Sequence, residues 1–441
     1  MVKDWMNENL KVPVCGSYDV VVAGGGPAGV SAAITAARAG ARTLLLEVAG
    51  CLGGVWTAGM LTWLFEFDKD GFTRELTAEL AKRGAKIGNN QDRYSYDVEE
   101  MKLLLEELCA AAGVDIQLHT RVVAAVKEGK RRLKGVVTES KSGRQVWLGK
   151  VFIDATGDGD LGFLSGCGFD YGYHSPQETQ PMTFMSLVQV NDPEALKAYI
   201  SFWGGDCDHP KRIRAWQGLL AEIRRAGVEP SYGRPTLFQV KGRLLAIMVN
   251  HEYGVSPMDA MQITQATIRG RAEVNRIVKA LAGLGGDWAG IQLVASAEHI
   301  GIREGRRIHG RYTVTLDDLQ KGARHEDAVV RVTFNVDVHS FSKKQNDQEA
   351  GLSHKGVATQ PYDIPFRALL AKDVDGLLMA GRCISGDFLS HASYRVTGNA
   401  VIMGQSAGVA AALSAQAGLD PHELPWDRCR SFLGQMERNP L

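Results

Sequence analysis

The stretch Tyr18–Glu47 reads YDVVVAGGGPAGVSAAITAARAGARTLLLE and predicts a strand, a glycine-rich turn, a helix, a second strand and a closing acid. Tyr18–Ala23 carries the β-branched residues of a buried parallel strand. Thr43–Leu46 forms the second strand, and Glu47 follows it at about twenty residues from the glycines. This order of elements is typical of a dinucleotide-binding βαβ unit.

Three glycines in this stretch fill a G-x-G-x-x-G pattern, and each is expected to have a separate task. Gly24 permits the tight turn, Gly26 lets the backbone approach a pyrophosphate, and Gly29 lets the helix pack closely on the strand. Pro27 falls where the helix is expected to begin, a position that needs no amide donor.

The acid at Glu47 specifies the kind of nucleotide. A carboxylate there accepts hydrogen bonds from a ribose 2′-hydroxyl and repels a 2′-phosphate, so the predicted ligand contains an ADP moiety without that phosphate. The alternative is a glycine-rich loop that only joins a strand to a helix. The complete strand, helix, strand and acid context favours the dinucleotide site.

Length and composition fit a globular protein. The 441 residues allow two to three structural units, and 45% hydrophobic and 23% charged residues are ordinary proportions. A formal net charge of zero gives no indication of nucleic acid or of an anionic membrane as a partner. Met1–Ser17 has no apolar core and is not a secretory signal, and the apolar run Ala400–Leu413 is too short to span a bilayer.

Cysteine and histidine spacing argue against several site types. The seven cysteines include no C-x-x-C pair, which disfavours a disulfide scaffold, a zinc ribbon or a dithiol redox pair. The eleven histidines show no H-x-H or H-E-x-x-H spacing, so no metal site is predicted. The expectation is a reduced, soluble, cytoplasmic protein without membrane or nucleic-acid partners and with an unspecified oligomeric state.

A second glycine-rich loop, Ala49–Met60, follows directly after Glu47. Its Gly53 and Gly54 would let the backbone lie against a flat cofactor, whereas the alternative is a flexible connector. Cys51 in this loop is interpreted as an inert small hydrophobe.

An amphipathic helix is predicted over Asp97–Ala112. Three strands are predicted after it: Val114–Val126, Leu133–Glu139 and Arg144–Phe152. The last of them leads into Gly157, Gly159 and Gly162, which formally match G-x-G-x-x-G and suggest a second nucleotide such as NAD(P)H. Phe163–Pro176 has no helical stripe and no strand-ending acid, so we interpret this strand as a return strand of the first sheet, with its turn touching the same dinucleotide.

The middle of the chain differs from the nucleotide-binding part in its pattern of predicted strands and helices. Short strands are predicted over Met182–Val190 and Arg243–Asn250, and a long helix over Pro257–Leu284. The apolar side predicted for that helix consists of Met261, Ile268, Ile277 and Leu281.

Closely spaced arginines follow this helix at 303, 306 and 307. Arginine presents a fixed donor fork that suits a carboxylate, although salt bridges to nearby acids are the alternative for each of them.

The last part of the chain is expected to return to the nucleotide domain. Leu377–Ala380 predicts a strand, Gly381–Gly398 a loop, and a helix begins near Asn399 with one side made of very small residues. Such a side permits close approach to a sheet or a flat ligand. Free amides at the helix start suit a ligand that becomes negative.

Four blocks together resemble the FAD-dependent oxidoreductase family with the two-domain glutathione-reductase-like flavoprotein fold, related to fumarate-reductase-type flavoproteins. The blocks are DVVVAGGGPAGVSAAI with Glu47 and CLGGVWTAG, then KVFIDATGDGDLG, GIREGRRIHGRYTVTLDD, and GLLMAGRCIS with RVTGNAVIMGQSAGVAAAL. The resemblance implies an α/β fold: a Rossmann-type FAD-binding domain with a parallel sheet, formed by residues 1–170 and 366–441, and a mixed α+β substrate or cap domain over 171–365.

The resemblance also implies which residues contact FAD. The ADP half is expected to contact Gly24, Gly26, Pro27, Ala28, Gly29 and Glu47, and the adenine to lie near Val123 with Val122. Gly53 and Gly54 are expected near the pyrophosphate and flavin, and Gly381 and Arg382 at the pyrophosphate and ribityl chain. Thr156, Gly157 and Asp158 are expected to contact the same cofactor, and Gly398 and Asn399 the pyrimidine end of the flavin.

The expected reaction is hydride transfer between a small organic substrate and flavin N5, assisted by a protein group that moves a proton. His391 is the first candidate for that group because it precedes the flavin-facing helix, with Tyr394 and Arg395 beside it; a structural histidine bonded to backbone is the alternative. Arg303 and Arg395 are expected to clamp an anionic substrate such as a carboxylate. Weaker candidates for catalysis are His251, Arg303, His339 and His354.

Two other functions compete with this one. The flavin could serve a protein partner in an electron-transfer subunit, or FAD could support structure or a redox-neutral reaction. The chain has no second nicotinamide motif and no reactive cysteine pair, which disfavours disulfide-reductase chemistry. The pattern does not distinguish a dehydrogenase from an oxidase or a reductase.

Overall fold

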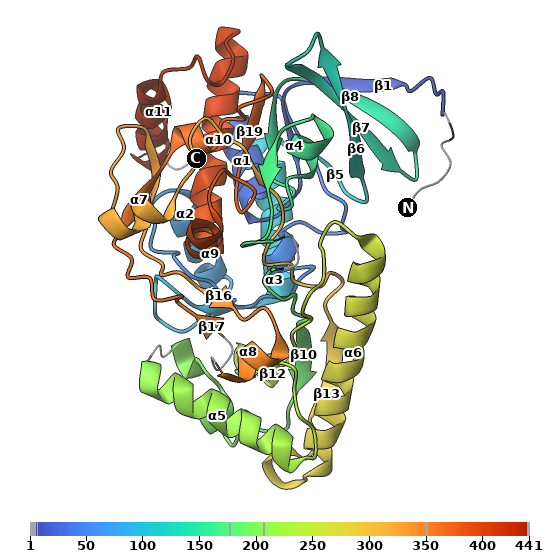
Figure 1. Cartoon of the computed structure of the whole chain (residues 1–441), viewed down its shortest axis with the longest axis vertical. Helices are drawn as coiled ribbons and strands as arrows, with labels where there is room; N and C mark the ends of the chain where they lie inside the picture. The colour runs from blue at the N-terminus through green and yellow to red at the C-terminus, as the bar shows by residue number, and fades with distance from the viewer. Residues whose placement is uncertain (1–5, 7, 176–177, 206–207, 349–351, 439–441) are drawn as a thin grey trace.

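The larger of two regions is built on a seven-stranded sheet with the order β5-β2-β1-β8-β7-β6, in which β19 also pairs with β8. The computed structural model describes residues 6, 8–175, 178–205, 208–348 and 352–438. The strands of this sheet are β1 Val14–Ala23, β2 Thr43–Leu46, β5 Asp115–Gln117, β6 Arg121–Glu128, β7 Arg132–Ser140, β8 Gly143–Asp154 and β19 Leu377–Met379. Figure 1 shows this sheet in the upper part of the molecule.

The nucleotide-binding half of the sheet is parallel, as predicted. β1 pairs in parallel with β2 and with β8, and Val22 lies opposite both Leu45 and Ile153. β19 pairs in parallel with β8 on its other side, whereas β6, β7 and β8 form an antiparallel meander. The interpretation of β8 as a return strand of the first sheet is therefore confirmed, and so is the α/β fold.

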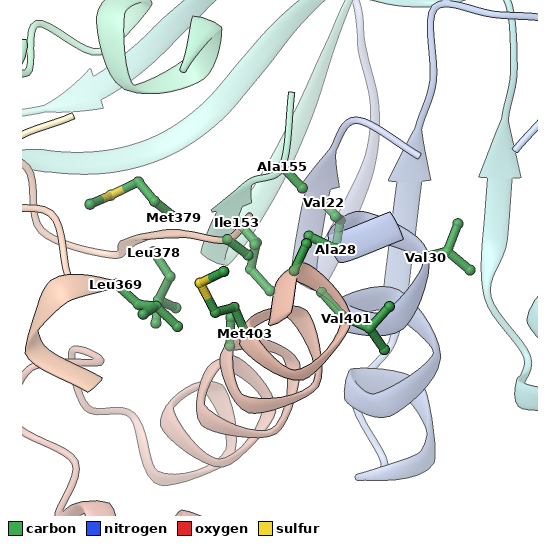
Figure 2. Close-up of a cluster of buried hydrophobic side chains, with 14 of the residues drawn as sticks. Val22, Ala28, Val30, Ile153, Ala155, Leu369, Leu378, Met379, Val401 and Met403 are labelled. Carbon is green, nitrogen blue, oxygen red and sulfur yellow. The ribbon is translucent and has the colours of Figure 1, made fainter. Parts of the chain in front are cut away.

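Two helices cover one face of the parallel strands. They are α1 Pro27–Arg38 and α10 Thr397–Ala417. Figure 2 shows side chains from β1, α1, β8, β19 and α10 in one apolar cluster, with Val22, Ile153 and Met403 among them. A Cβ at Gly404 or Gly408 of α10 would collide with the backbone of α1, so the small residues let the helix axes come close.

α10 is the one helix, within the part of the chain that the structure describes, that is long and apolar enough to cross a membrane. In the most apolar window of this helix 83% of the residues are buried inside the protein. Its composition is therefore explained by packing in the core.

Short elements complete the larger region. Its other helices are α2 Phe72–Lys82, α3 Val98–Ala112, α4 Asp160–Leu164, α7 Leu316–Lys321, α9 Phe388–Tyr394 and α11 Trp426–Arg438. Its short strands are β3 Lys86–Ile87, β4 Ser95–Tyr96, β9 Phe169–Asp170, β14 Arg307–Ile308, β15 Ala328–Val332, β16 Val338–His339, β17 Leu352–Ser353 and β18 Tyr362–Pro365. The 3-10 turns of the chain are Gly54–Trp56, Lys197–Tyr199, Trp203–Gly205, Gly286–Trp288 and Phe366–Ala368.

Two predicted loops contain helices. The segment Gly381–Gly398 holds α9, because the side chain of Asp387 accepts a hydrogen bond from the amide of Ser390 at 2.8 Å and caps a new helix. The turn at Gly157 also leads into a helix, the single turn α4, which begins three residues before Phe163.

The smaller region consists of a second sheet and its helices, in the lower part of Figure 1. The sheet is antiparallel with the order β11-β12-β10-β13. Its strands are β10 Ser186–Gln189, β11 Thr236–Lys241, β12 Leu244–Met248 and β13 Gln292–Ser296, and the nearby helices are α5 His209–Arg225, α6 Ala260–Gly283 and α8 Lys343–Gln348.

The hydrophobic clusters divide the chain differently from the expected boundaries at 171 and 365. The core of the smaller region, which we call the cap, draws its residues from Met182 to Ile300. Ile308, Val330 and Ile364 instead pack in the core of the larger region. The cap core is therefore shorter than the predicted middle segment.

The predicted apolar side of α6 was partly wrong. Ile277 and Leu281 are fully buried, but Met261 and Ile268 are 65% and 59% exposed. Ile268 lies nine residues from Ile277, which at 3.6 residues per turn places it about half a turn away on the opposite side of the helix. The buried stripe runs instead through Ala266, Gly270 and Val274.

The contact between α1 and α10 predicts a specific sensitivity. Gly408→Ala should lower the free energy of unfolding by about 1–3 kcal/mol, because the new methyl group collides with the carbonyl of Ala32. Urea unfolding followed by circular dichroism measures the change. Gly434→Ala in α11 is the matched control: its Cβ would meet nothing within 4 Å, so the substitution should be neutral or stabilising by up to about 1 kcal/mol. Equal destabilisation by both would contradict the close contact.

Candidate functional site

In the glycine loop between β1 and α1, packing leaves no room for a side chain at two glycines and leaves room at a third. Gly24 has a φ of +97°, and a Cβ there would lie 2.5 Å from the carbonyl oxygen of Ala155. A Cβ at Gly29 would collide with the carbonyl of Gly24, whereas a Cβ at Gly26 would meet nothing within 4 Å. Gly26 precedes α1 without a side-chain cap, so the backbone amides at the start of this helix face open space.

Glu47 joins the glycine loop to the loop that follows β2. Its side chain is buried, with Oε2 accepting a hydrogen bond from the Gly25 amide at 2.5 Å and Oε1 accepting one from the Ala49 amide at 2.8 Å. These bonds fix the carboxylate at the carboxyl end of β2, where it lines a cavity. The carboxylate is held in a fixed position, in which it would accept a hydrogen bond from a ribose hydroxyl.

We call the space at this edge of the sheet the cofactor cavity; its volume is about 640 Å³. Most of the predicted cofactor residues line it: Gly24, Gly26, Pro27, Ala28, Glu47, Gly54, Thr156, Gly157, Asp158, Gly381 and Arg382. They come from loops at the carboxyl ends of β1, β2, β8 and β19, where parallel α/β sheets bind ligands.

Five predicted cofactor residues do not line this cavity. Gly29 lies behind the glycine loop, and the amide of Gly53 donates to the carbonyl of Gly25 at 2.7 Å. Val122 lines the cavity in place of Val123, as expected where successive strand residues face opposite ways. At the start of α10, Thr397 and Ala400 line it rather than Gly398 and Asn399; Gly398 packs against the backbone of Glu66 and Asn399 is fully buried.

The residues present fit a dinucleotide. The Nε atom of Arg382 is buried and has no hydrogen-bond partner within the described residues, although its Nη2 pairs with Asp158 at 2.6 Å. Together with the open space over Gly26, this donor leaves room and hydrogen-bonding capacity for a phosphate-bearing ligand.

A second cavity, of about 280 Å³, lies between the cap sheet and the larger region, and we call it the aromatic cavity. It shares border residues with the cofactor cavity: Val55, Gly59, Gly301, Ile302, Arg382, Arg395 and Thr397. Glu47 and Val122 line only the cofactor cavity. The aromatic cavity therefore adjoins the end of the cofactor cavity away from Glu47 and Val122.

Part of the wall of the aromatic cavity is made of stacked aromatic rings. The rings of Trp63 and Phe202 stack with centroids 3.7 Å apart and an interplanar angle of 19°, and the Phe238 ring lies 5.7 Å from Phe202 at 7°. Phe65 and Phe334 form a further pair with a centroid distance of 5.3 Å. These rings give this part of the cavity an apolar wall.

A cationic cluster lies at one part of this cavity. The Arg395 Nη2 donates to the Asp337 carbonyl at 2.9 Å and pairs with the Asp337 carboxylate at 3.3 Å. The Arg303 Nη1 donates to the carbonyl of Pro181 and to Oγ1 of Thr183, both at 2.6 Å. Burial and then the nearby Arg395 charge lower the pKa of Arg303 to about 10.

A histidine pair adjoins these arginines. Nδ1 of His339 lies 3.0 Å from Nε2 of His251, and one of the two nitrogens donates to the other. Nε2 of His339 lies 3.6 Å from the Asp337 carboxylate, too far for a hydrogen bond but close enough for electrostatic attraction. His339 lines the aromatic cavity, and His251 lies behind it, packed on Tyr232 with ring centroids 3.9 Å apart.

Burial governs the protonation of this group. Burial and then the Arg303 charge lower the pKa of His339 to about 4, so its imidazole is neutral at neutral pH. Burial favours a higher pKa for Asp337, but the attraction of His339, Arg395 and Arg303 outweighs it and holds that pKa below its usual range. Asp337 is therefore the ionised carboxylate of the cluster.

The structure does not bring the first catalytic candidate to this cavity. His391 lies in α9 with no exposed surface and is absent from the linings of both cavities, and burial lowers its pKa well below the usual value. Tyr394 is equally buried, and its hydroxyl donates to the carbonyl of Ile384 at 3.1 Å. The expectation for these two residues is corrected because α9, unforeseen in the sequence, directs them into the core.

The other candidates divide between the cavity and its surroundings. Arg303, Arg395 and His339 line the aromatic cavity, whereas His354 bonds through Nδ1 to the Val336 carbonyl at 2.5 Å, away from it. Asp337 and the ring of Trp63 were not singled out from the sequence. No local motif marks them, since each lies in an irregular segment and acquires its role only through long-range folding.

The fold and the cofactor cavity define an α/β dinucleotide-dependent protein. The family model of the FAD dependent oxidoreductases matches residues 19–433, and the chain belongs to this family. The protein is thus an FAD-dependent oxidoreductase with FAD as its cofactor, as the sequence resemblance implied. A search of curated proteins finds no match.

Solved structures similar to this chain include a reductase-like protein and two flavin-dependent halogenating enzymes. A geranylgeranyl bacteriochlorophyll reductase-like protein from Thermoplasma acidophilum is 14% identical, with 96% of this chain and 84% of that chain covered and a TM-score of 0.49. The myxobacterial chondrochloren halogenase CndH is 13% identical, with coverage of 97% and 80% and a TM-score of 0.47. The flavin-dependent brominase Bmp2 is 13% identical, with coverage of 95% and 84% and a TM-score of 0.48.

The open space over Gly26 predicts a separation of cofactor binding from folding. Gly26→Val should weaken FAD binding by about tenfold or more, because its side chain occupies cavity space, while the apoprotein keeps its thermal stability. Gly26 has a φ of −72° in extended backbone, which valine adopts without strain. Titration of apoprotein with FAD, followed by flavin fluorescence, measures the affinity. Gly434→Ala, in α11 and outside both cavities, is the control, and retained FAD affinity in Gly26→Val would contradict this role.

The lowered histidine pKa values predict a pH dependence of stability. His339 is neutral in the folded protein down to about pH 4, whereas in the unfolded chain it takes up a proton near its ordinary pKa of 6.5. As the pH falls from 6.5 to 4, the unfolded state binds more protons and the free energy of unfolding decreases, by up to about 1.4 kcal/mol per pH unit for each such group.

Urea unfolding of the apoprotein at pH 7, 6 and 5 measures this slope. His339→Gln should reduce it, whereas His299→Gln, at an exposed side chain, should leave it unchanged. An unaltered slope in His339→Gln would show that His339 titrates normally in the fold.

Proposed function

We propose that this oxidoreductase transfers hydride between a small organic substrate in the aromatic cavity and the flavin of FAD. The observation that carries the proposal is the shared border of the two cavities. At this border Arg395 lies beside both of them, and His339 and Arg303 line the substrate side. These residues are far apart in the sequence, and the fold brings them together at this border.

Bound FAD supplies the acceptor for one hydride, that is, two electrons and a hydrogen nucleus. In the oxidative direction a substrate C–H bond breaks and its electron pair leaves with the hydride. A proton leaves a neighbouring O–H, N–H or C–H group, and a new double bond forms between the two atoms. The protein therefore needs one group that accepts a proton near the substrate.

We assign that group to His339. Its imidazole is neutral at neutral pH because burial and Arg303 disfavour the cation, so one ring nitrogen is available as an acceptor. The nearby Asp337 carboxylate, 3.6 Å from Nε2, would stabilise the imidazolium after proton transfer. His251, 3.0 Å from Nδ1, holds the ring orientation.

The two arginines would bind and orient the substrate. Arg303 is held by the Pro181 carbonyl and Thr183, so its guanidinium has a fixed position in the cavity wall. Arg395 is fixed by Asp337 at the border with the cofactor cavity. An anionic group on the substrate would place the reacting carbon beside the flavin at the border.

We also place the protein in the cytoplasm. The six cysteines that lie within the described residues are all free, and five of them are buried. A reducing compartment is compatible with this state.

Anaerobic mixing of the holoenzyme with panels of carboxylates, amines and sugars tests the function through bleaching of the oxidised flavin absorbance. His339→Gln should slow flavin reduction by about 10²- to 10⁴-fold without changing FAD affinity, because the proton acceptor is lost. His391→Asn should change the rate little, since His391 lies outside both cavities.

Stopped-flow absorbance gives both rates. Equal rates for His339→Gln and the unsubstituted enzyme would overturn the assignment of the base. Failure of every compound in the panels to reduce the flavin would count against hydride transfer from a small substrate.

A further inference from the structure

We propose that the substrate is an aromatic monocarboxylate: a small flat ring system carrying one carboxylate, which Arg303 binds. This inference rests on the function proposed above and adds the chemical class of the molecule in the aromatic cavity. It follows from two independent features of the lining, the balance of charge and the geometry of the rings.

Two arginines that line the aromatic cavity, Arg303 and Arg234, have no ion pair among the described residues, and Arg234 lies over the ring of Trp216. Arg395 pairs with Asp337 at 3.3 Å and Arg382 pairs with Asp158 at 2.6 Å. Across the described ranges of the chain, no carboxylate lies within ion-pair distance of Arg303, whose hydrogen bonds go only to neutral oxygens. A charge enclosed by protein is costly without a partner, so one negative charge on the substrate would pair with Arg303.

The anchoring of Arg303 favours a carboxylate as that charge. Its hydrogen bonds to Pro181 and Thr183 both use Nη1, so the Nη2 and Nε donors are left for a ligand. These two donors form the planar fork that matches the two oxygens of a carboxylate. Arg212 and Arg234, which also line the cavity, lie instead over the rings of Phe202 and Trp216.

The rings of the wall favour a flat, apolar body. Trp63, Phe202 and Phe238 lie with interplanar angles of 7° to 22°, so their faces are nearly parallel. A planar ring packs on such faces in an offset stack, which stabilises binding beyond the effect of its buried area. The cavity volume of about 280 Å³ is at the lower end for small-molecule sites and suits one or two fused rings.

The carboxylate would also affect the assigned base. Arg303 is the second cause, after burial, of the low pKa of His339. A carboxylate bound to Arg303 reduces that repulsion and makes His339 a stronger proton acceptor when the site is filled. The same ion pair therefore binds the substrate and prepares the group that removes its proton.

The test measures binding to the oxidised holoenzyme and does not depend on turnover. Phenylacetate, 3-phenylpropionate and indole-3-acetate are titrated while the flavin absorbance is followed, with calorimetry as a second readout. The matched probes are the corresponding neutral amides, which keep the ring, and aliphatic acids of similar atom number such as octanoate, which keep the charge. The aromatic acids should bind about tenfold or more tightly than either set.

Variants separate the two halves of the inference. Arg303→Gln should remove the preference for acid over amide, and Arg303→Lys should keep part of it because the charge remains without the fork. Phe238→Leu should reduce the preference for aromatic over aliphatic acids. Arg271→Gln, at an exposed position on α6, should change neither preference.

The outcomes distinguish this inference from the proposed function. Equal binding of acids and amides, or of aromatic and aliphatic acids, would overturn the substrate class, and so would flavin bleaching by neutral substrates alone. Tight binding of aromatic acids would support the class even if none of the compounds tested reduced the flavin, in which case the proposed hydride transfer would be the part that fails. If Arg303→Gln does not fold, the comparison of acids with amides in the unsubstituted enzyme still decides the matter.

Discussion

The packing of α10 on α1 is the contact on which the site depends. α1 begins at Pro27 and α10 at Thr397, and the absence of side chains at Gly404 and Gly408 lets the two helices touch through their backbones. The hydrogen bond from Ser31 Oγ to the Val401 carbonyl, 2.8 Å long, fixes their register. Two helix starts from opposite ends of the sequence therefore lie at one edge of the sheet, where their amides and dipoles favour a phosphate-bearing, electron-accepting cofactor.

The sequence predicts this part of the fold well because its signals are local. Thr43–Leu46 is a strand with the predicted bounds, and Glu47 lies where the motif requires an acceptor. Prediction from the sequence fails where long-range packing determines which side chains are buried. Ile268 is apolar in sequence yet exposed on α6, because the helix turns the stripe of Ala266 and Ile277 toward the cap sheet.

The catalytic cluster was harder to predict than the cofactor site for the same reason. Proximity in sequence to the start of α10 favoured His391, but the Asp387 cap creates α9 and turns that imidazole into the core. His339 stands more than fifty residues before α10 and reaches the cavity through β16, which only the tertiary fold places there. A motif specifies its own loop, whereas a site assembled from several loops depends on all of their packing.

Charge connects the substrate side to the cofactor side of the protein. Asp158 and Asp337 each neutralise one arginine at the border, whereas no carboxylate among the described residues lies within ion-pair distance of Arg303. Burial and then the Arg303 charge keep His339 neutral, since a second cation beside Arg303 would raise the electrostatic energy. A neutral histidine is the form that accepts a proton, so the arginine that would bind an anion also sets the protonation state that oxidation requires. Removing the charge of Arg303 or that of the bound anion would therefore alter both substrate binding and proton transfer.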